Sequence, residues 1–242
     1  VGQGADLRHR SVQQRGRVLN ETPVSADAPA DDPYLVLTPA GALHAYGERV
    51  PDETSAILQT LMPRGASLRR SAWLELAPEH RTVLARALYE GWVHEVQREL
   101  RAPDVRLDNY LPHAIAGLSG TRTAALASDE GFCLARVGYS EEEAETLCVV
   151  AADFFDFAKR QKQRGWTGTG RAVSFHEGID MLLPTTTLML FWVDGTGYWL
   201  ILGGEPLLNN RALVELIWGI RTAGTKFAVR ETTSIASQIL SM

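Results

Sequence analysis

The longest apolar segment of the chain predicts its central element. Residues 188–193 are an unbroken apolar run, and residues 198–202 form a second run after a short segment that contains two glycines. Two strand-length runs on either side of such a turn are typical of a β-hairpin. Because neither run alternates apolar with polar residues, we expect both faces of the hairpin to be covered. The hairpin is therefore expected to lie within a larger sheet that has helices, or a partner, on each side.

Shorter patterns predict the remaining strands. The alternating segment at residues 171–176 predicts a strand with Val173 and Phe175 on the same face. Apolar runs that flank turn residues predict two more hairpins. Their strands are expected at residues 34–37 with 42–46, and at residues 121–126 with 132–137.

Apolar residues at helical spacing predict the helices. The best specified helix begins at Ser140, which forms a capping box with Glu143, and ends at Gly165. Acidic residues crowd its first turn and basic residues its last, which complements the helix dipole. Further helices are expected at residues 52–62, at 79–100, at 107–115, and from Asn209 or Asn210 to Gly224.

The helix that begins at Ser140 carries two apolar stripes. At 100° per residue, the first stripe contains Ala144, Leu147, Cys148, Ala151, Phe155 and Ala158. The second stripe, rotated by roughly a quarter-turn, contains Val150, Phe154 and Phe157. This arc exceeds the ~100° needed to sit on one sheet. The second contact is either another helix of the same chain or a neighbouring protomer, and we favour the protomer because phenylalanines are common at interfaces.

These elements predict an α/β (α+β) fold in which a central, mostly antiparallel sheet is sandwiched by helices. We expect a flexible tail at residues 1–32, an N-terminal extension with a hairpin and helices at 33–104, a sheet-containing domain at 105–225, and a C-terminal tail at 226–242. Whether residues 33–104 form a second domain or wrap the first is left open.

Composition narrows the function classes. Hydrophobic residues at 45% and charged residues at 22% are typical of a globular protein, and no apolar run predicts a membrane span or a secretory signal. A net charge of −5 does not favour nucleic-acid binding by the whole body. The two cysteines, Cys133 and Cys148, have apolar neighbours and are expected to be buried, reduced thiols. A cytoplasmic location is therefore expected.

Candidate chemistry is sparse. The motif His176-Glu177-x-x-Asp180 differs from a zinc-helix motif because its second ligand is Asp and Gly178 interrupts the helix. The glycines of residues 165–170 lack the Gly-Lys-Ser/Thr ending of a phosphate loop. We therefore expect no metal, no cofactor and no enzyme activity. The enzyme alternative would use Cys133 as nucleophile with His176 and Asp180 nearby.

A basic arm near the start of the chain supplies another alternative. Arg8, Arg10, Arg15 and Arg17 cluster with no acidic residue among them. Such an arm predicts a subunit of a larger assembly that binds nucleic acid or an acidic partner through the arm. Nucleic-acid binding is expected only through this arm.

Three stretches carry a resemblance to a known family. Residues 124–131 run along an apolar strand into an Asp-x-Gly turn, residues 140–158 combine an acidic start with an apolar helix, and residues 188–203 form the closing strands. Together they resemble the Roadblock (dynein light chain) family, whose fold is related to longin and profilin domains. The resemblance covers residues 105–225, about half of the chain. Extra residues at 177–187 and the N-terminal extension depart from the family pattern.

The resemblance implies a non-enzymatic dimerisation or scaffold module. Family members pair their middle helices and the adjacent edge strands, and many bind Ras-like small GTPases or join larger complexes. By that resemblance we expect a homodimer or paralogue heterodimer, with a small GTPase or a larger complex as partner. The interface is then expected to contain Val150, Phe154, Phe157, Val173 and Phe175.

Overall fold

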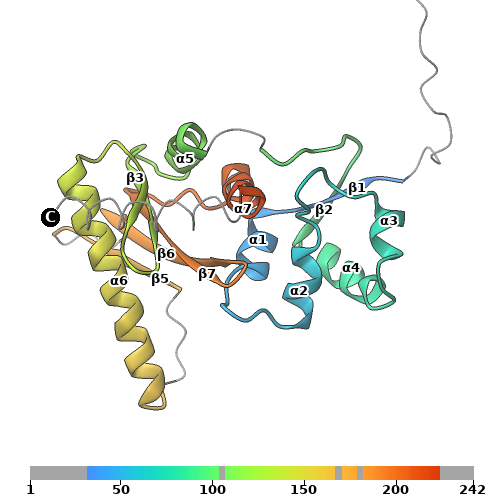
Figure 1. Ribbon diagram of the computed structural model, residues 1–242, viewed down its shortest axis with the longest axis horizontal. Coiled ribbons are helices and arrows are strands. Elements are labelled where there is room, and N and C mark those ends of the chain that lie inside the picture. The colour runs from blue at the N-terminus through green and yellow to red at the C-terminus, as the bar shows by residue number, and fades with distance from the viewer. Residues whose placement is uncertain (1–31, 104–106, 167–170, 179–181, 224–242) are drawn as a thin grey trace, which may run out of the picture. The chain divides into compact units, whose positions relative to one another are not determined.

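The structure is a computed structural model that describes residues 32–103, 107–166, 171–178 and 182–223. Its main element is a five-stranded antiparallel sheet with the strand order β4-β3-β7-β6-β5. The strands are β3 (Ala124–Ser128), β4 (Cys133–Val137), β5 (Ala172–Phe175), β6 (Thr186–Val193) and β7 (Thr196–Gly203). Helices cover this sheet on both faces (Figure 1). The predicted α+β class with an antiparallel sheet between helices is confirmed.

The central hairpin forms as predicted. Strands β6 and β7 pair from Thr186 opposite Gly203 to Val193 opposite Thr196. Asp194 and Gly195 connect them with positive φ angles of 49° and 84°. Two successive residues in the left-handed region match the twist of a two-residue hairpin, and Gly195 adopts it without a steric penalty.

One face of the sheet is covered by α6 (Glu141–Gln163). The predicted capping box is present: the Ser140 hydroxyl accepts from the Glu143 backbone N–H at 3.2 Å, and the Glu143 carboxylate accepts from the Ser140 N–H at 2.8 Å. The fully buried residues of α6 are Ala144, Cys148 and Ala151. They pack against the sheet residues of the same face, which are Ala125, Ala127, Leu188, Trp199 and Ile201. The first predicted stripe therefore faces the sheet.

The opposite face carries a larger core. Helices α5 (Leu107–Ala116) and α7 (Arg211–Ala223) pack there, and Asn210 starts α7 by accepting a hydrogen bond from the Ala212 N–H at 2.9 Å. Sheet residues of this face include Leu126, Met189, Phe191, Leu200 and Leu202. Alternate residues of one strand therefore serve two different cores.

The N-terminal region corrects two predictions. Residues 34–46 do not form a hairpin: β1 (Tyr34–Leu37) is followed by α1 (Pro39–Ala45). The Thr38 hydroxyl accepts from the Gly41 N–H at 3.0 Å, and Pro39 occupies the first turn. A Thr-Pro pair that can begin a turn can also begin a helix, and here it begins a helix.

The second correction concerns the helix expected at residues 79–100. Helix α4 (His80–Tyr89) is shorter than predicted: it ends at Tyr89, and Gly91 follows with a φ of +69°. The chain then forms β2 (Val93–Val96), which pairs antiparallel with β1. Leu84 and Ala87 are buried as a helical stripe requires, but Val93 is buried as a strand residue. Pairing with a distant strand therefore overrides the apparent helical period.

Two short helices complete this region. They are α2 (Glu53–Gln59), which lies within the predicted range and is capped by Asp52, and α3 (Arg70–Leu74), which was not predicted. The largest core combines residues of this region, such as Tyr46 and Trp73, with Ile115 and Ile217. The domain boundary expected between residues 104 and 105 is not tested by this shared core and stays a prediction. No described helix combines the length and hydrophobicity that crossing a membrane requires.

Candidate functional site

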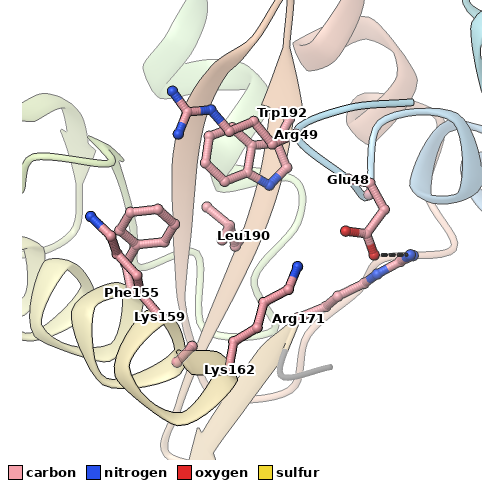
Figure 2. Close-up of a pocket in the computed structure, with 10 residues that line it drawn as sticks. Glu48, Arg49, Phe155, Lys159, Lys162, Arg171, Leu190 and Trp192 are labelled. Atoms are coloured by element: carbon pink, nitrogen blue, oxygen red, sulfur yellow. Dashed lines mark hydrogen bonds and ion pairs between the residues drawn. The ribbon is translucent and has the colours of Figure 1, made fainter. Parts of the chain in front are cut away.

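A pocket of about 310 Å³ lies where four segments that are distant in the sequence meet, one of them represented by Arg171 alone. Figure 2 shows the loop after α1, the C-terminal half of α6 and the strand β6 around it. It is lined by Gly47, Glu48, Arg49, Phe155, Ala158, Lys159, Lys162, Arg171, Leu190 and Trp192. A concave site of this size, with apolar walls and a few charged groups, is typical of a ligand-binding site.

Regular secondary structure positions two walls of the pocket. Phe155, Lys159 and Lys162 are spaced by four and three residues along α6 and share one helix face. Leu190 and Trp192 are two residues apart on β6 and share one sheet face. The Leu190 N–H donates to the Arg171 carbonyl at 2.9 Å, which fixes the start of the neighbouring edge strand beside the pocket.

The third wall is the loop at residues 47–49. It is held next to the sheet because the Trp192 N–H donates to the Tyr46 carbonyl at 2.8 Å. Arg221 of α7 also donates to the Tyr46 hydroxyl at 2.6 Å. Burial raises the pKa of Tyr46 to about 12, although Arg221 opposes that shift, so the hydroxyl stays neutral. Close packing favours glycine at residue 47, since a Cβ there would lie 2.7 Å from the backbone carbonyl oxygen of Leu43.

The pocket has an excess of positive charge. Arg49, Lys159, Lys162 and Arg171 face a single acidic residue, Glu48, which gives the lining a formal charge of +4 − 1 = +3. Glu48 pairs with Arg171 at 2.8 Å, and the two side chains are 55% and 46% exposed. The other three cations make no ion pair with any residue that the structure describes. A surplus of unpaired cations in a concave site favours an anionic ligand.

Aromatic rings form the apolar part of the pocket. The Arg49 guanidinium lies 5.6 Å from the centroid of the Trp192 ring, and Phe155 packs against the same ring at 5.7 Å. Figure 2 shows Lys162 extending from α6 toward the Arg171 side, whereas Lys159 extends along Phe155. Flat cationic and aromatic surfaces next to separate ammonium groups can hold a planar group and phosphates together.

The predicted interface residues lie beside this pocket but do not line it. Phe154 and Phe175 are in contact within one chain, with ring centroids 5.7 Å apart. Phe157 is 45% exposed, while Val150 and Val173 are half-buried. The structure thus brings α6 and the edge strand β5 together, and the assignment of these residues to a protomer interface stays a prediction.

The other candidate sites are the basic arm and the set of Cys133, His176 and Asp180. The basic arm with Arg8, Arg10, Arg15 and Arg17 lies outside the described residues, as does Asp180. Cys133 lies on β4 and His176 follows β5, at opposite edges of the sheet. Four strand spacings of about 4.8 Å separate these edges by about 19 Å. This strand order does not bring together the Cys133 and His176 that the enzyme alternative would use.

The residues of the pocket were not predicted as a site. Lys159 and Lys162 were interpreted only as charges that complement the helix dipole, and Arg49 follows a segment expected to be a strand. The spacing of Phe155, Lys159 and Lys162 was the available signal. Among the described residues there is also no cluster of His, Cys, Asp and Glu that could hold a metal ion.

Comparisons with known proteins give one match to a curated protein and one to a solved structure. No protein-family model matches the chain. The chain is 28% identical over 138 residues to a protein described as "Probable dual-specificity RNA methyltransferase RlmN" from Synechococcus sp. (strain CC9902). The match covers 56% of this chain and 37% of that protein, so the chain spans little more than a third of its relative.

The solved structure is a Roadblock/LC7 domain from Streptomyces avermitilis. It is 17% identical, with a TM-score of 0.34, over 52% of this chain and 99% of that domain. At this level of similarity it carries no inference about function or assembly.

The predicted function needs correction. We expected a non-enzymatic scaffold that binds a small GTPase, or an assembly subunit that acts through its basic arm. The curated match overturns this expectation, because it is to a protein named for an action on RNA and it lends no support to a scaffold.

Proposed function

We propose that this chain is an RNA-binding module and that the pocket around Trp192 receives a nucleotide of an unpaired RNA strand. The observation that carries the proposal is a pocket lined by four cationic side chains, one of which, Arg49, lies over the ring of Trp192. The name of the curated relative supports RNA as the class of nucleic acid. The basic N-terminal arm plays no part in this proposal.

The cations supply the contacts to the RNA backbone. Phosphates attract Lys and Arg whatever the sequence, and this attraction provides most of the affinity of non-specific binding. Lys162 extends into the pocket from α6, whereas the Arg171 guanidinium lies at Glu48, so the two are placed for separate phosphate contacts. Lys159 lies one helical turn away on the same face and is placed for a neighbouring phosphate.

The aromatic wall supplies the contact to a base. Trp192 is 6% exposed, so its ring supports Arg49 more than it meets solvent. The guanidinium plane of Arg49, held by cation–π contact with Trp192, offers a stacking surface to an unpaired base. Stacking of this kind tolerates any base, so we expect weak sequence preference.

The net charge of −5 limits binding to this site. A negatively charged protein repels RNA over most of its surface, so contact depends on the local positive charge of the pocket. Arg171 already forms an ion pair with Glu48, but an exposed ion pair contributes only about 0 to 1 kcal/mol to stability. A phosphate can therefore displace the Glu48 carboxylate.

We also propose that the chain binds RNA without transforming it. The relative's activity belongs to a protein of which this chain spans 37%. The thiol and the imidazole that the sequence offered for catalysis lie at opposite sheet edges. The expected homodimer or paralogue heterodimer and the expected cytoplasmic location stay predictions that RNA binding does not require.

Fluorescence anisotropy with a labelled 12-nucleotide single-stranded RNA tests the proposal. The double variant Lys159→Ala/Lys162→Ala should weaken binding about tenfold or more and should reduce the slope of log K against log salt by about one to two. The control is Arg81→Ala/Arg98→Ala, which makes the same charge change at exposed positions outside the pocket. Equal loss in both variants, or no binding by the unaltered chain, would contradict the proposal.

A further inference from the structure

The only two cysteines of the chain lie at the same small core. Cys133 lies on β4 and Cys148 on α6, and both belong to the core between the sheet and this helix. Cys148 is completely buried, whereas Cys133 is half-buried and within reach of solvent. Cys133 packs against the core to which Cys148 belongs, and each thiol shifts the pKa of the other. This contact is distinct from the pocket around Trp192, whose lining contains neither cysteine.

The backbone around Cys133 brings it to the helix. The turn between β3 and β4 contains Gly131 with a φ of +91°, and a Cβ there would lie 3.3 Å from the Cys148 carbonyl oxygen. The turn therefore lies directly on α6. The register between β3 and β4 shifts at Ala127, the residue opposite Cys133. Such irregularities reorient a side chain at the edge of a sheet, and β4 is an edge strand.

Hydrogen bonding favours a thiolate at Cys133, although burial and the charge of Glu145 oppose it. The hydrogen bond from Cys148 lowers the pKa of Cys133 to about 7, and the nearby positive charge of Arg136 acts in the same direction. The same hydrogen bond and burial raise the pKa of Cys148. Cys133 can thus react as a nucleophilic thiolate, while Cys148 stays protonated.

We propose that Cys133 and Cys148 form an oxidation site at which a hydroperoxide converts the two thiols into an intrachain disulfide. The Cys133 thiolate attacks one peroxide oxygen, the O–O bond breaks, and the other oxygen leaves as hydroxide, so that Cys133 becomes a sulfenic acid. The Cys148 sulfur then attacks the Cys133 sulfur, loses its proton, and displaces the oxygen as water. In total the two thiols lose two electrons and two protons, and hydrogen peroxide is reduced to two molecules of water.

The disulfide would join the edge strand β4 to the middle of α6. To form the bond, the two sulfurs must approach to about 2.05 Å. The residues between Cys133 and Cys148 form the β4–α6 connection, so the bond closes a short loop and restricts the unfolded chain. We expect the oxidised protein to have a midpoint of thermal unfolding higher by roughly 5 °C.

Intact-mass spectrometry of the full chain tests the proposal. One equivalent of hydrogen peroxide should lower the mass by about 2 Da and abolish alkylation of both cysteines together, and dithiothreitol should reverse both changes. Because the chain contains no other cysteine, the assignment is unambiguous. A mass gain of about 32 Da at Cys133, with Cys148 still open to alkylation after unfolding, would overturn the proposal.

Single variants separate the roles of the two thiols. Cys148→Ala should leave Cys133 as a sulfenic acid that dimedone traps, formed more slowly because the thiol that lowers the pKa of Cys133 is gone. Cys133→Ala should leave Cys148 unreactive to peroxide. If Cys133 in Cys148→Ala and Cys148 in Cys133→Ala reacted equally with peroxide, Cys133 would not be the attacking group. The unaltered chain alone decides whether the disulfide forms, so the proposal stays testable if either variant folds poorly.

Discussion

The two faces of the five-stranded sheet are packed in different ways. The face under α5 and α7 has a large apolar core with bulky residues, including Phe191, Leu200 and Ile217. The face under α6 has a smaller core, and the buried helix residues are the small side chains Ala144, Cys148 and Ala151. All three lie in the N-terminal half of α6, while its C-terminal half lines the pocket.

This difference shows where the fold leaves room for function. Small residues let α6 approach the sheet closely at one end, and the large residues Phe155 and Trp192 keep open space at the other. A completely packed face stabilises the domain, whereas an incompletely packed face can accept a ligand. We therefore assign stability to the face under α5 and α7 and ligand binding to the face under α6.

The largest expected effect compares one substitution on the two faces. Phe191→Ala should lower the free energy of unfolding by about 3 to 5 kcal/mol, because Phe191 is fully buried and stacks on Tyr198. Phe155→Ala should cost no more than about 1.5 kcal/mol, because this ring is only half-buried beside the pocket. Urea denaturation of the two variants measures both values, and equal losses would break the comparison.

The second prediction concerns the ion pair at the pocket. Arg171→Gln should weaken RNA binding about fivefold, because one phosphate contact is lost. Glu48→Gln should strengthen it by about twofold to fivefold, because Arg171 no longer has a competing carboxylate. Anisotropy titrations at one salt concentration measure both changes. A change of the same sign in the two variants would exclude Arg171 as a phosphate ligand.

Some parts of this structure could be predicted from the sequence, and others could not. The central hairpin and α6 could be predicted because their signals are local: two apolar runs around a Gly-bearing turn, and a capping box at Ser140. The strand β2 could not be predicted, because Val93 pairs with Leu37 across a long separation in the sequence. The pocket was missed for the same reason. Arg49 and Lys162 meet only through the tertiary fold.

The third prediction separates the two halves of α6. Ser140→Ala should lower the free energy of unfolding by about 1 kcal/mol, because it removes the hydroxyl that accepts from the Glu143 N–H. RNA affinity should stay within about twofold, since the pocket lies at the other end of the helix. Thermal unfolding and anisotropy on the same preparation measure both quantities. A parallel loss of RNA affinity would show that the halves of α6 are coupled.

The smallest expected effect is a pH dependence at α2, which belongs to the stability side of the comparison. The hydrogen bonds from Ser55 hold the pKa of Asp52 below its ordinary value of 3.8. Because the folded pKa is lowered, the stabilisation is complete above the ordinary pKa and is lost as the pH falls through the folded pKa. Asp52→Asn keeps a capping side chain but removes the titration, so its stability should fall less between pH 5 and pH 2. Identical pH profiles from urea denaturation would contradict this role.

The most direct test of the central claim is to locate the bound RNA. A uridine-rich single-stranded RNA can be crosslinked to the full chain by ultraviolet light, and the attachment sites can be mapped by mass spectrometry. We expect attachment to peptides that contain Phe155 to Lys162, or Leu190 and Trp192, and loss of these products in Lys159→Ala/Lys162→Ala. Attachment confined to residues 8–17, or unchanged in the double variant, would contradict RNA binding at the pocket.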